Sequence, residues 1–142
     1  MRALVLDGDP RLAVDWPNPC RKPGECLVAT RLSGVCDTDL QLARGYMGFR
    51  GVPGHEVVGC VLDTDDPAWL GRRVVVQINA GCGQCVDCTL RDGHHCACRT
   101  VLGIAGRPGT FAERFTVPTA CLVAVPESLS DELAVFAEPL AA

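Results

Sequence analysis

The sequence predicts a mainly β fold, arranged as a barrel or a sandwich of short strands. Two observations support this prediction. Short apolar or alternating runs, rich in valine and leucine, recur along the 142 residues, and glycine, proline or aspartate separates them. No Gly-x-Gly-x-x-Gly turn leads from a strand into a helix, as a dinucleotide-binding fold of two βαβ halves would require. The length suits one domain with a core of its own.

Chain breakers divide the predicted strands from one another. Pro23-Gly24, Pro53-Gly54 and Pro108-Gly109 are typical turn dipeptides, and each precedes an apolar run. The predicted strands are Arg2–Asp7, Glu25–Val35, Val57–Leu62, Arg73–Ile78, Phe111–Val117 and Leu122–Val125.

Only two stretches have helical character. Asp37–Arg44 has Asp37 or Thr38 available as an N-cap and a glycine after its end. Ser130–Ala137 begins with a serine cap and two acids, which favour a helix N-terminus, and Pro139 is expected to interrupt it. The segment 81–99 has neither a helical nor a strand period, and we expect a lobe organised by a metal ion.

The composition limits the partners and the compartment. A net charge of −4 without a clustered basic face argues against nucleic acid or an anionic membrane as a partner. No apolar run approaches the ~20 residues of a membrane span, and Met1–Asp7 has too few apolar residues for a signal-peptide core. The ten cysteines therefore indicate a reducing compartment. We expect a cytoplasmic protein whose clustered cysteines bind metal rather than form disulfides.

Four cysteines lie in the spacing Cys82-x2-Cys85-x2-Cys88-x7-Cys96. A Cys-x2-Cys step lets two sulfurs reach one metal from a tight turn, and four thiolates suit a closed tetrahedral zinc site with a structural role. Cys98 could compete as the fourth ligand, whereas the two histidines before Cys96 are expected to be loop residues.

A second set of ligand types is spread along the chain. Cys36 lies where a predicted strand meets a helix N-terminus, which favours a metal-binding thiolate; a buried packing cysteine is the alternative. His55 is the predicted ligand of the next motif, and Glu56 is a neighbour or occasional ligand. Adjacent strand residues point to opposite faces unless the preceding turn distorts the backbone. A surface His–Glu pair is the alternative. Glu138 lies near a helix break, where a glutamate is usually solvated. It is a candidate ligand only because Cys36 and His55 are also present in the sequence.

Six motifs, taken in order, resemble the zinc-containing medium-chain dehydrogenase/reductase family. The resemblance extends from the first strand to the last residue. The motifs are Gly34-Val-Cys-Asp-Thr-Asp39, Pro53-Gly-His-Glu-Val-Val-Gly59, Gly71-Arg-Arg-Val-Val-Val76, the four-cysteine lobe, Gly109-Thr-Phe-Ala-Glu113 and Phe136-Ala-Glu-Pro-Leu140.

The resemblance implies a GroES-like β-barrel catalytic domain over residues 1–142, with the zinc lobe at about 81–99. It also implies a catalytic zinc bound by Cys36, His55 and a third protein ligand. Glu138 matches that third ligand in the polyol- and threonine-dehydrogenase branches, where other alcohol dehydrogenases have a cysteine. Glu56 matches a carboxylate beside the zinc that ligates it in some states.

The resemblance also implies roles around the metal. Asp39 matches the acid that orients the zinc-bound histidine, and Thr38 matches the hydroxyl that takes the substrate proton. The chain departs from the family at Gln41, where a histidine often continues the proton relay. It departs also at Asp37, where some members carry an arginine near the cofactor phosphates.

The implied activity is oxidation of an alcohol or polyol to a carbonyl by hydride transfer to NAD or NADP. We expect two zinc ions per chain and a Rossmann cofactor domain after residue 142. On this view the isolated chain would be inactive and the full-length protein a homo-oligomer. The alternatives are a non-enzymatic zinc-binding barrel module and a quinone-reductase-like relative. Cys36, His55 and Glu138 together argue against the latter.

Overall fold

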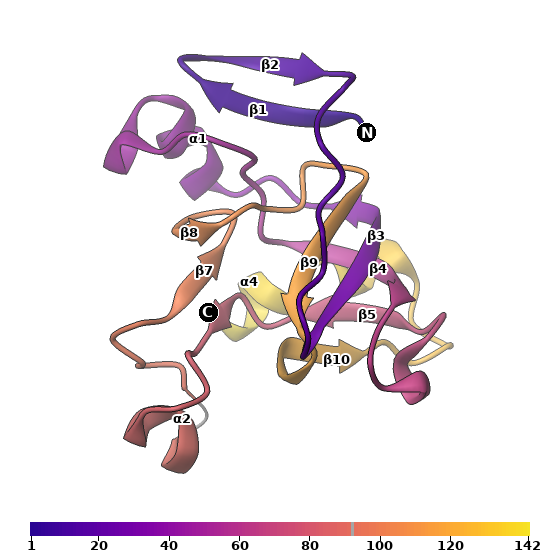
Figure 1. Cartoon of the computed structure of the whole chain (residues 1–142). Helices are drawn as coiled ribbons and strands as arrows, with labels where there is room; N and C mark the ends of the chain where they lie inside the picture. Colours follow the sequence, from indigo (N-terminus) through magenta and orange to yellow (C-terminus); the bar gives the residue numbers. More distant parts are fainter. Residues whose placement is uncertain (92) are drawn as a thin grey trace.

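A computed structural model describes residues 1–91 and 93–142 of the chain. The chain is mostly strand with a few short helices, so the predicted mainly β fold with a cysteine lobe is confirmed (Figure 1). The strands are β1 (Ala3–Asp7), β2 (Asp9–Ala13), β3 (Glu25–Ser33), β4 (Val57–Asp63), β5 (Arg73–Val76), β6 (Asn79–Ala80), β7 (Thr100–Leu102), β8 (Gly106–Arg107), β9 (Arg114–Pro118) and β10 (Leu122–Ala124). The α-helices are α1 (Asp37–Ala43), α2 (Val86–Leu90), α3 (Asp131–Ala134) and α4 (Ala137–Ala141), and single 3-10 turns lie at Tyr46–Gly48, Pro67–Trp69 and Thr119–Cys121.

A five-stranded antiparallel sheet forms the main body, in the order β10-β5-β4-β3-β9. Its inner face buries branched and aromatic side chains such as Val28, Val74 and Phe115. The register of β3 against β4 shifts twice, and shifts of this kind increase the local twist of a sheet. All six predicted strands are present, although β9 begins at Arg114 rather than Phe111 and β5 ends at Val76.

The N-terminal hairpin of β1 and β2 forms a second layer with a small core of its own. Isolated bridges from Ala3 to Ala112 and from Leu6 to Gly51 attach it to the body. The sequence did not predict β2, because four of its five residues are exposed and show no apolar alternation. Pro10 fits there because a proline is tolerated on an edge strand.

Strands β6, β7 and β8 form a small separate sheet, and the cysteine lobe with α2 extends from it (Figure 1). These elements have two to five residues each, too short to show a period in the sequence. The segment 81–99, which shows neither a helical nor a strand period in the sequence, contains one short helix, α2.

Helix α1 begins after an N-cap at Cys36, not at Asp37 or Thr38 as predicted. The backbone N–H of Cys36 donates to the carboxylate of Asp39 at 3.0 Å, which satisfies a free donor at the helix start. Gly45 adopts a φ of 93° directly after the C-cap and ends the helix as predicted.

The predicted helix 130–137 is divided into α3 and α4, and the break falls at Val135 and Phe136 rather than at Pro139. Pro139 lies in the first turn of α4, where an N–H has no intrahelical partner and a proline costs little. No helix among the described residues is long and apolar enough to cross a membrane.

Two arginines hold the start of α3 against the sheet. Arg31 Nε and Arg73 Nη1 donate to the two carboxylate oxygens of Asp131 at 2.7 and 2.6 Å. Arg73 Nη2 also donates to the carbonyls of Leu129 at 2.7 Å and Pro126 at 2.9 Å. One guanidinium on β5 thus fixes the segment that leads into α3 and α4.

We expect Asp131→Asn to lower the free energy of unfolding by about 1–2 kcal/mol at neutral pH. The expected loss is no larger because Arg31 is exposed and water weakens its interaction with the carboxylate. The hydrogen bond from Arg31, and after it that from Arg73, outweighs burial and holds the pKa of Asp131 below its usual value. Such a carboxylate stabilises the fold above the unfolded pKa of about 4, and this stabilisation is lost as pH falls through the folded pKa.

Urea unfolding at several pH values measures this difference. Glu127→Gln is the matched control, because the Glu127 side chain is exposed and forms no ion pair among the described residues. The gap between wild type and Asp131→Asn should narrow as the pH falls below about 4. A gap that is independent of pH would contradict the assignment.

Candidate metal centres

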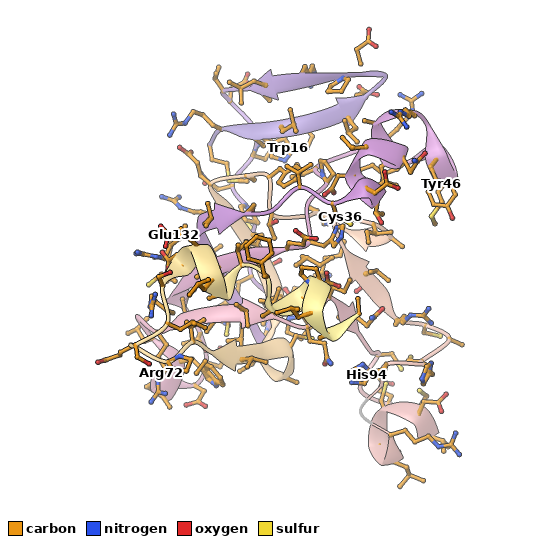
Figure 2. The ribbon with its side chains drawn as sticks, turned by 180° about the vertical axis from the view of Figure 1, so that it is seen from behind. Trp16, Cys36, Tyr46, Arg72, His94 and Glu132 are labelled. Atoms are coloured by element: carbon orange, nitrogen blue, oxygen red, sulfur yellow. The ribbon has the colours of Figure 1, made fainter. Side chains whose placement is uncertain are left out.

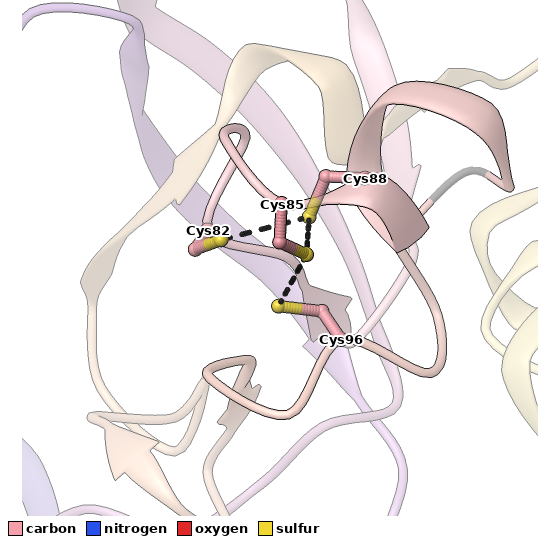
Figure 3. A group of neighbouring side chains, drawn as sticks. All are labelled: Cys82, Cys85, Cys88 and Cys96. Carbon is pink, nitrogen blue, oxygen red and sulfur yellow. Dashed lines mark hydrogen bonds between the residues drawn. The ribbon is translucent and has the colours of Figure 1, made fainter.

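The four cysteines of the lobe bring their sulfurs together (Figure 3). The Sγ atom of Cys85 lies 3.6 Å from those of Cys88 and Cys96, and the Sγ atoms of Cys82 and Cys88 are 3.8 Å apart. Tetrahedral zinc with Zn–S bonds of about 2.3 Å places its sulfurs about 3.8 Å apart. The cluster therefore has the dimensions of a closed four-thiolate site, and Cys98 lies outside the group.

Two glycines make room for these sulfurs. A Cβ atom at Gly81 would lie 2.7 Å from Cys88 Sγ, and one at Gly93 would lie 3.1 Å from the same atom. Gly93 also has a φ of 73°, which other residues rarely adopt. The lobe thus depends on glycine at both positions, for space and for backbone conformation.

The thiols of the lobe differ in acidity. Hydrogen bonds from the backbone N–H groups of Gln84 and Cys85 lower the pKa of Cys82 to about 6. Cys85 shows the opposite shift. The backbone N–H of Cys88 lowers the pKa of Cys85, but the side-chain hydrogen bond with Cys88 and burial together outweigh this effect and raise the pKa to about 12. Adjoining thiolates repel one another, and a divalent cation would offset this repulsion.

A second group joins Cys36, His55 and Glu56, whose ligand atoms all lie within 4.8 Å of one another. His55 and Glu56 are 3 % and 7 % exposed, and Cys36 is partly exposed at the start of α1. Strand β4 begins only at Val57, so the alternation of a regular strand does not separate His55 from Glu56. The alternative of a surface His–Glu pair is therefore wrong.

The turn before His55 is fixed by a neighbouring loop. The carbonyls of Pro53 and Gly54 accept hydrogen bonds from the N–H groups of Phe111 and Thr110, each at 3.0 Å. Gly54 has a φ of 97°. A Cβ atom at Gly103 or Gly109 would lie under 3.0 Å from the Gly54 carbonyl oxygen.

Gly103 and Gly109 thus pack directly on the turn that presents His55. The sequence indicated only a turn at Pro108-Gly109 and the start of a family motif at Gly109, and it indicated no contact of either glycine with Gly54. They lie about fifty positions from Gly54, and no local signal relates the two segments.

Asp39 connects the two ligand-bearing segments. Its buried carboxylate accepts hydrogen bonds from the N–H groups of Cys36 at 3.0 Å and Gly54 at 3.1 Å. Its Oδ1 atom lies 3.6 Å from Nδ1 of His55, which leaves Nε2 of the ring free for a metal. Burial lowers the pKa of His55, but Asp39 and then Cys36 raise it to about 9.

The group fits a zinc ion. Nδ1 of His55 is buried and has no hydrogen-bond partner within bonding distance among the described residues, and the Asp39 carboxylate lies 3.6 Å from it. A thiolate, an imidazole and a carboxylate form the mixed ligand set of a catalytic zinc, which keeps a position open. Two anionic groups around a buried histidine favour a cation at their centre.

Glu138 and Thr38 lie near this group but outside it. Glu138 is half-buried in α4, and its pKa is raised above the usual value. Burial is the main cause; the charge of His55 lowers the pKa, and the charge of Glu56 raises it. Glu138 thus lies within electrostatic reach of both residues. Thr38 is half-buried in the first turn of α1, beside Cys36. Figure 2 shows Cys36 in the middle of the molecule, between α1 and α4.

A cavity of about 570 Å³ lies beside Glu138. Gln77 and His94 line it too, and the Gln77 amide nitrogen lies 2.9 Å from Nε2 of His94. This contact joins the cysteine lobe to the end of β5. His94 was expected to be a loop residue because four thiols are available as ligands, and nothing in the sequence indicated its contact with Gln77, 17 positions away.

Cys60 and Cys121 lie in apolar runs of the sequence, which predicts that both thiols pack in the core. Cys121 is buried, as predicted. Cys60 was also expected in the core, but it is only half-buried on β4, and its thiol contacts the Gly71 carbonyl oxygen at 3.4 Å.

Residues 22–127 match the alcohol dehydrogenase GroES-like domain. An L-threonine 3-dehydrogenase of Chelativorans sp. is 34% identical over 134 residues, which cover 87% of this chain and 38% of that protein. An erythritol/L-threitol dehydrogenase of Mycolicibacterium smegmatis is 35% identical over 99% of this chain and 44% of its own length. The chain thus spans about two fifths of the length of these relatives.

Solved structures give the same result. A short chain alcohol dehydrogenase of Escherichia coli, complexed with NADH, superposes with a TM-score of 0.86 at 29% identity and covers 98% of this chain and 42% of its own. A zinc-binding dehydrogenase of Sinorhizobium meliloti, bound to NADP, gives a TM-score of 0.84 at 29% identity over 99% of this chain and 42% of its own. The predicted GroES-like fold is confirmed.

Proposed function

Since the chain belongs to the zinc-containing medium-chain dehydrogenase/reductase family through its alcohol dehydrogenase GroES-like domain, we propose that it is a catalytic zinc domain. The parent protein would oxidise an alcohol or polyol to a carbonyl by hydride transfer to NAD or NADP. One observation carries the proposal. A mixed Cys36–His55–Glu56 group and a closed four-thiol group occur in one small barrel.

The two groups suit two different tasks. The four sulfurs of the lobe would surround a zinc ion completely and leave no place for a substrate, which is a structural role. Cys36, His55 and Glu138 or Glu56 would hold the other ion. A zinc ion held there would supply Lewis-acid chemistry for the substrate oxygen.

The protein's own groups would orient the ligands and move the proton. Asp39 would orient the His55 ring, because its carboxylate lies 3.6 Å from Nδ1 and Nε2 is left for the metal. The Thr38 hydroxyl, in the first turn of α1, would take the substrate proton and pass it outward. Gln41 donates weakly to Asp37 at 3.4 Å and cannot titrate, so the proton would leave through water or another group.

The cofactor would be held by a second, Rossmann-type domain. The relatives are more than twice as long as the part that this chain matches, and two structural neighbours carry NADH or NADP. The cavity beside Glu138 would then face the cofactor and the substrate. A homo-oligomer in the cytoplasm remains our expectation for the whole protein.

The test is metal analysis and assay of the natural-length protein. We expect two zinc ions per chain, matching the two groups, and NAD(P)H formation from alcohols or polyols that chelation abolishes. A panel of threonine, erythritol and simple secondary alcohols would narrow the substrate class. One zinc ion per chain, with a freely alkylated Cys36 and no turnover, would favour a non-enzymatic zinc module or a quinone-reductase-like protein instead.

A further inference from the structure

Gly34 lies directly opposite Glu56, where β3 and β4 meet the metal group. Its N–H donates to the Glu56 carbonyl at 2.9 Å, next to the last paired residues of the two strands, Ser33 and Val57. Gly34 is not among the glycines with a positive φ. Backbone conformation therefore does not explain a glycine at this position.

Space explains it. A Cβ atom at Gly34 would lie under 3.0 Å from Oε2 of Glu56, 3.1 Å from its Cβ and 3.3 Å from its Cδ. The strand pairing holds both backbones in place, so the side chain of Glu56 would have to move. The carboxylate occupies the room that a side chain at Gly34 would fill.

Little else holds this carboxylate. Glu56 is 7 % exposed as a residue. Among the described residues no group donates a hydrogen bond to its carboxylate, whose oxygens keep some contact with solvent. Cys36 and His55 lie within 4.8 Å of it. Steric exclusion at Gly34 and a cation beside Cys36 and His55 are therefore the two factors that can fix the position of this carboxylate.

We propose that Gly34 is a positioning residue of the metal centre. Its missing side chain places the Glu56 carboxylate beside Cys36 and His55, so that this carboxylate can serve the metal. The inference rests on the proposed function. It adds that the space left at Gly34 decides whether the Glu56 carboxylate is available as a further protein ligand of the metal.

Cobalt(II) binding tests the proposal, because the visible spectrum of cobalt(II) depends on the number and type of its ligands. The four-cysteine site is first filled with zinc, and cobalt is then titrated into wild type, Gly34→Ala, Glu56→Ala and the double variant. We expect Gly34→Ala to weaken cobalt binding about 10- to 100-fold and to change the spectrum toward that of Glu56→Ala.

The double variant gives the decisive comparison. Gly34→Ala should add little in the Glu56→Ala background, because the Oε2 and Cδ atoms of Glu56 that the new methyl group would meet are then absent. An equal loss from Gly34→Ala in both backgrounds, or wild-type cobalt binding by Gly34→Ala, would overturn the inference.

Gly59→Ala separates positioning from simple destabilisation. Gly59 also lacks a positive φ, and its Cβ would lie under 3.0 Å from Val28 and from the Ala29 carbonyl oxygen, away from the metal group. We expect a lower melting temperature with an unchanged cobalt spectrum. If Gly34→Ala behaves in the same way, Gly34 is merely structural. If wild type binds no cobalt at the Cys36 group, the proposed function fails together with the inference.

Discussion

Replacing Cys36 by serine is expected to lower the zinc content from two ions per chain to one and to leave the fold intact. A serine hydroxyl is a far poorer zinc ligand than a thiolate, so the Cys36 group loses its strongest donor. Serine is also a preferred N-cap residue, and Cys36 occupies the N-cap of α1. Helix α1 should therefore persist, with Asp39 still bonded to the N–H of residue 36.

The activity of the natural-length protein should fall at least about 1,000-fold, because Lewis-acid catalysis contributes several kcal/mol to transition-state stabilisation. Elemental analysis, thermal unfolding and the NAD(P)H assay measure the three effects separately. Cys60→Ser is the matched control, since Cys60 is half-buried and lies outside both metal groups. Wild-type turnover by Cys36→Ser would refute the site assignment.

Replacing Cys88 by serine is expected to disrupt the lobe while the Cys36 group keeps its metal. The described part of the lobe buries little apolar surface, since Val86 and Leu90 on α2 are 68% and 77% exposed. A bound zinc ion would therefore provide most of the free energy that orders it. Structural zinc sites contribute about 10–16 kcal/mol of apparent binding free energy at neutral pH, so loss of one ligand should be severe.

Limited proteolysis measures this effect locally. We expect rapid cleavage between residues 81 and 99 in Cys88→Ser, together with loss of one zinc ion and a lower melting temperature. Cys98→Ser is the control, because Cys98 is exposed and lies outside the four-cysteine group. Unchanged metal content and melting temperature in Cys88→Ser would show that the sulfurs hold no ion.

The sequence predicted those parts of the fold that depend on local patterns. Short apolar or alternating runs between chain breakers predicted β3 and β4, and the cysteine spacing predicted the cluster of four sulfurs. Each of these signals is local, because it is contained in a short stretch of sequence. The break between α3 and α4 was predicted at Pro139 because proline is a strong breaker. The structure places it at Val135 and Phe136, and Pro139 occupies a first turn where it is tolerated.

The sequence predicted the candidate ligands of the site but not the contacts between distant segments that hold those ligands in place. Cys36 and His55 were expected to meet, and the structure brings them together with Glu56. Zinc binding and the roles of Thr38 and Glu138 remain predictions. The packing of Gly103 on Gly54 was not predictable, because it joins segments far apart in the chain. A single sequence carries no signal for such contacts.

The lobe and the barrel differ in how far apart in the chain their partners lie. Barrel closure joins residues as distant as Cys26 and Thr119, which are 93 positions apart. The sulfurs of Cys85 and Cys96 are separated by only 11 positions. Loop closure costs less entropy for the shorter segment, and low contact order favours fast folding. During synthesis we therefore expect the lobe to bind its ion before β9 has paired with β3. Metal binding in the lobe would then come before closure of the barrel.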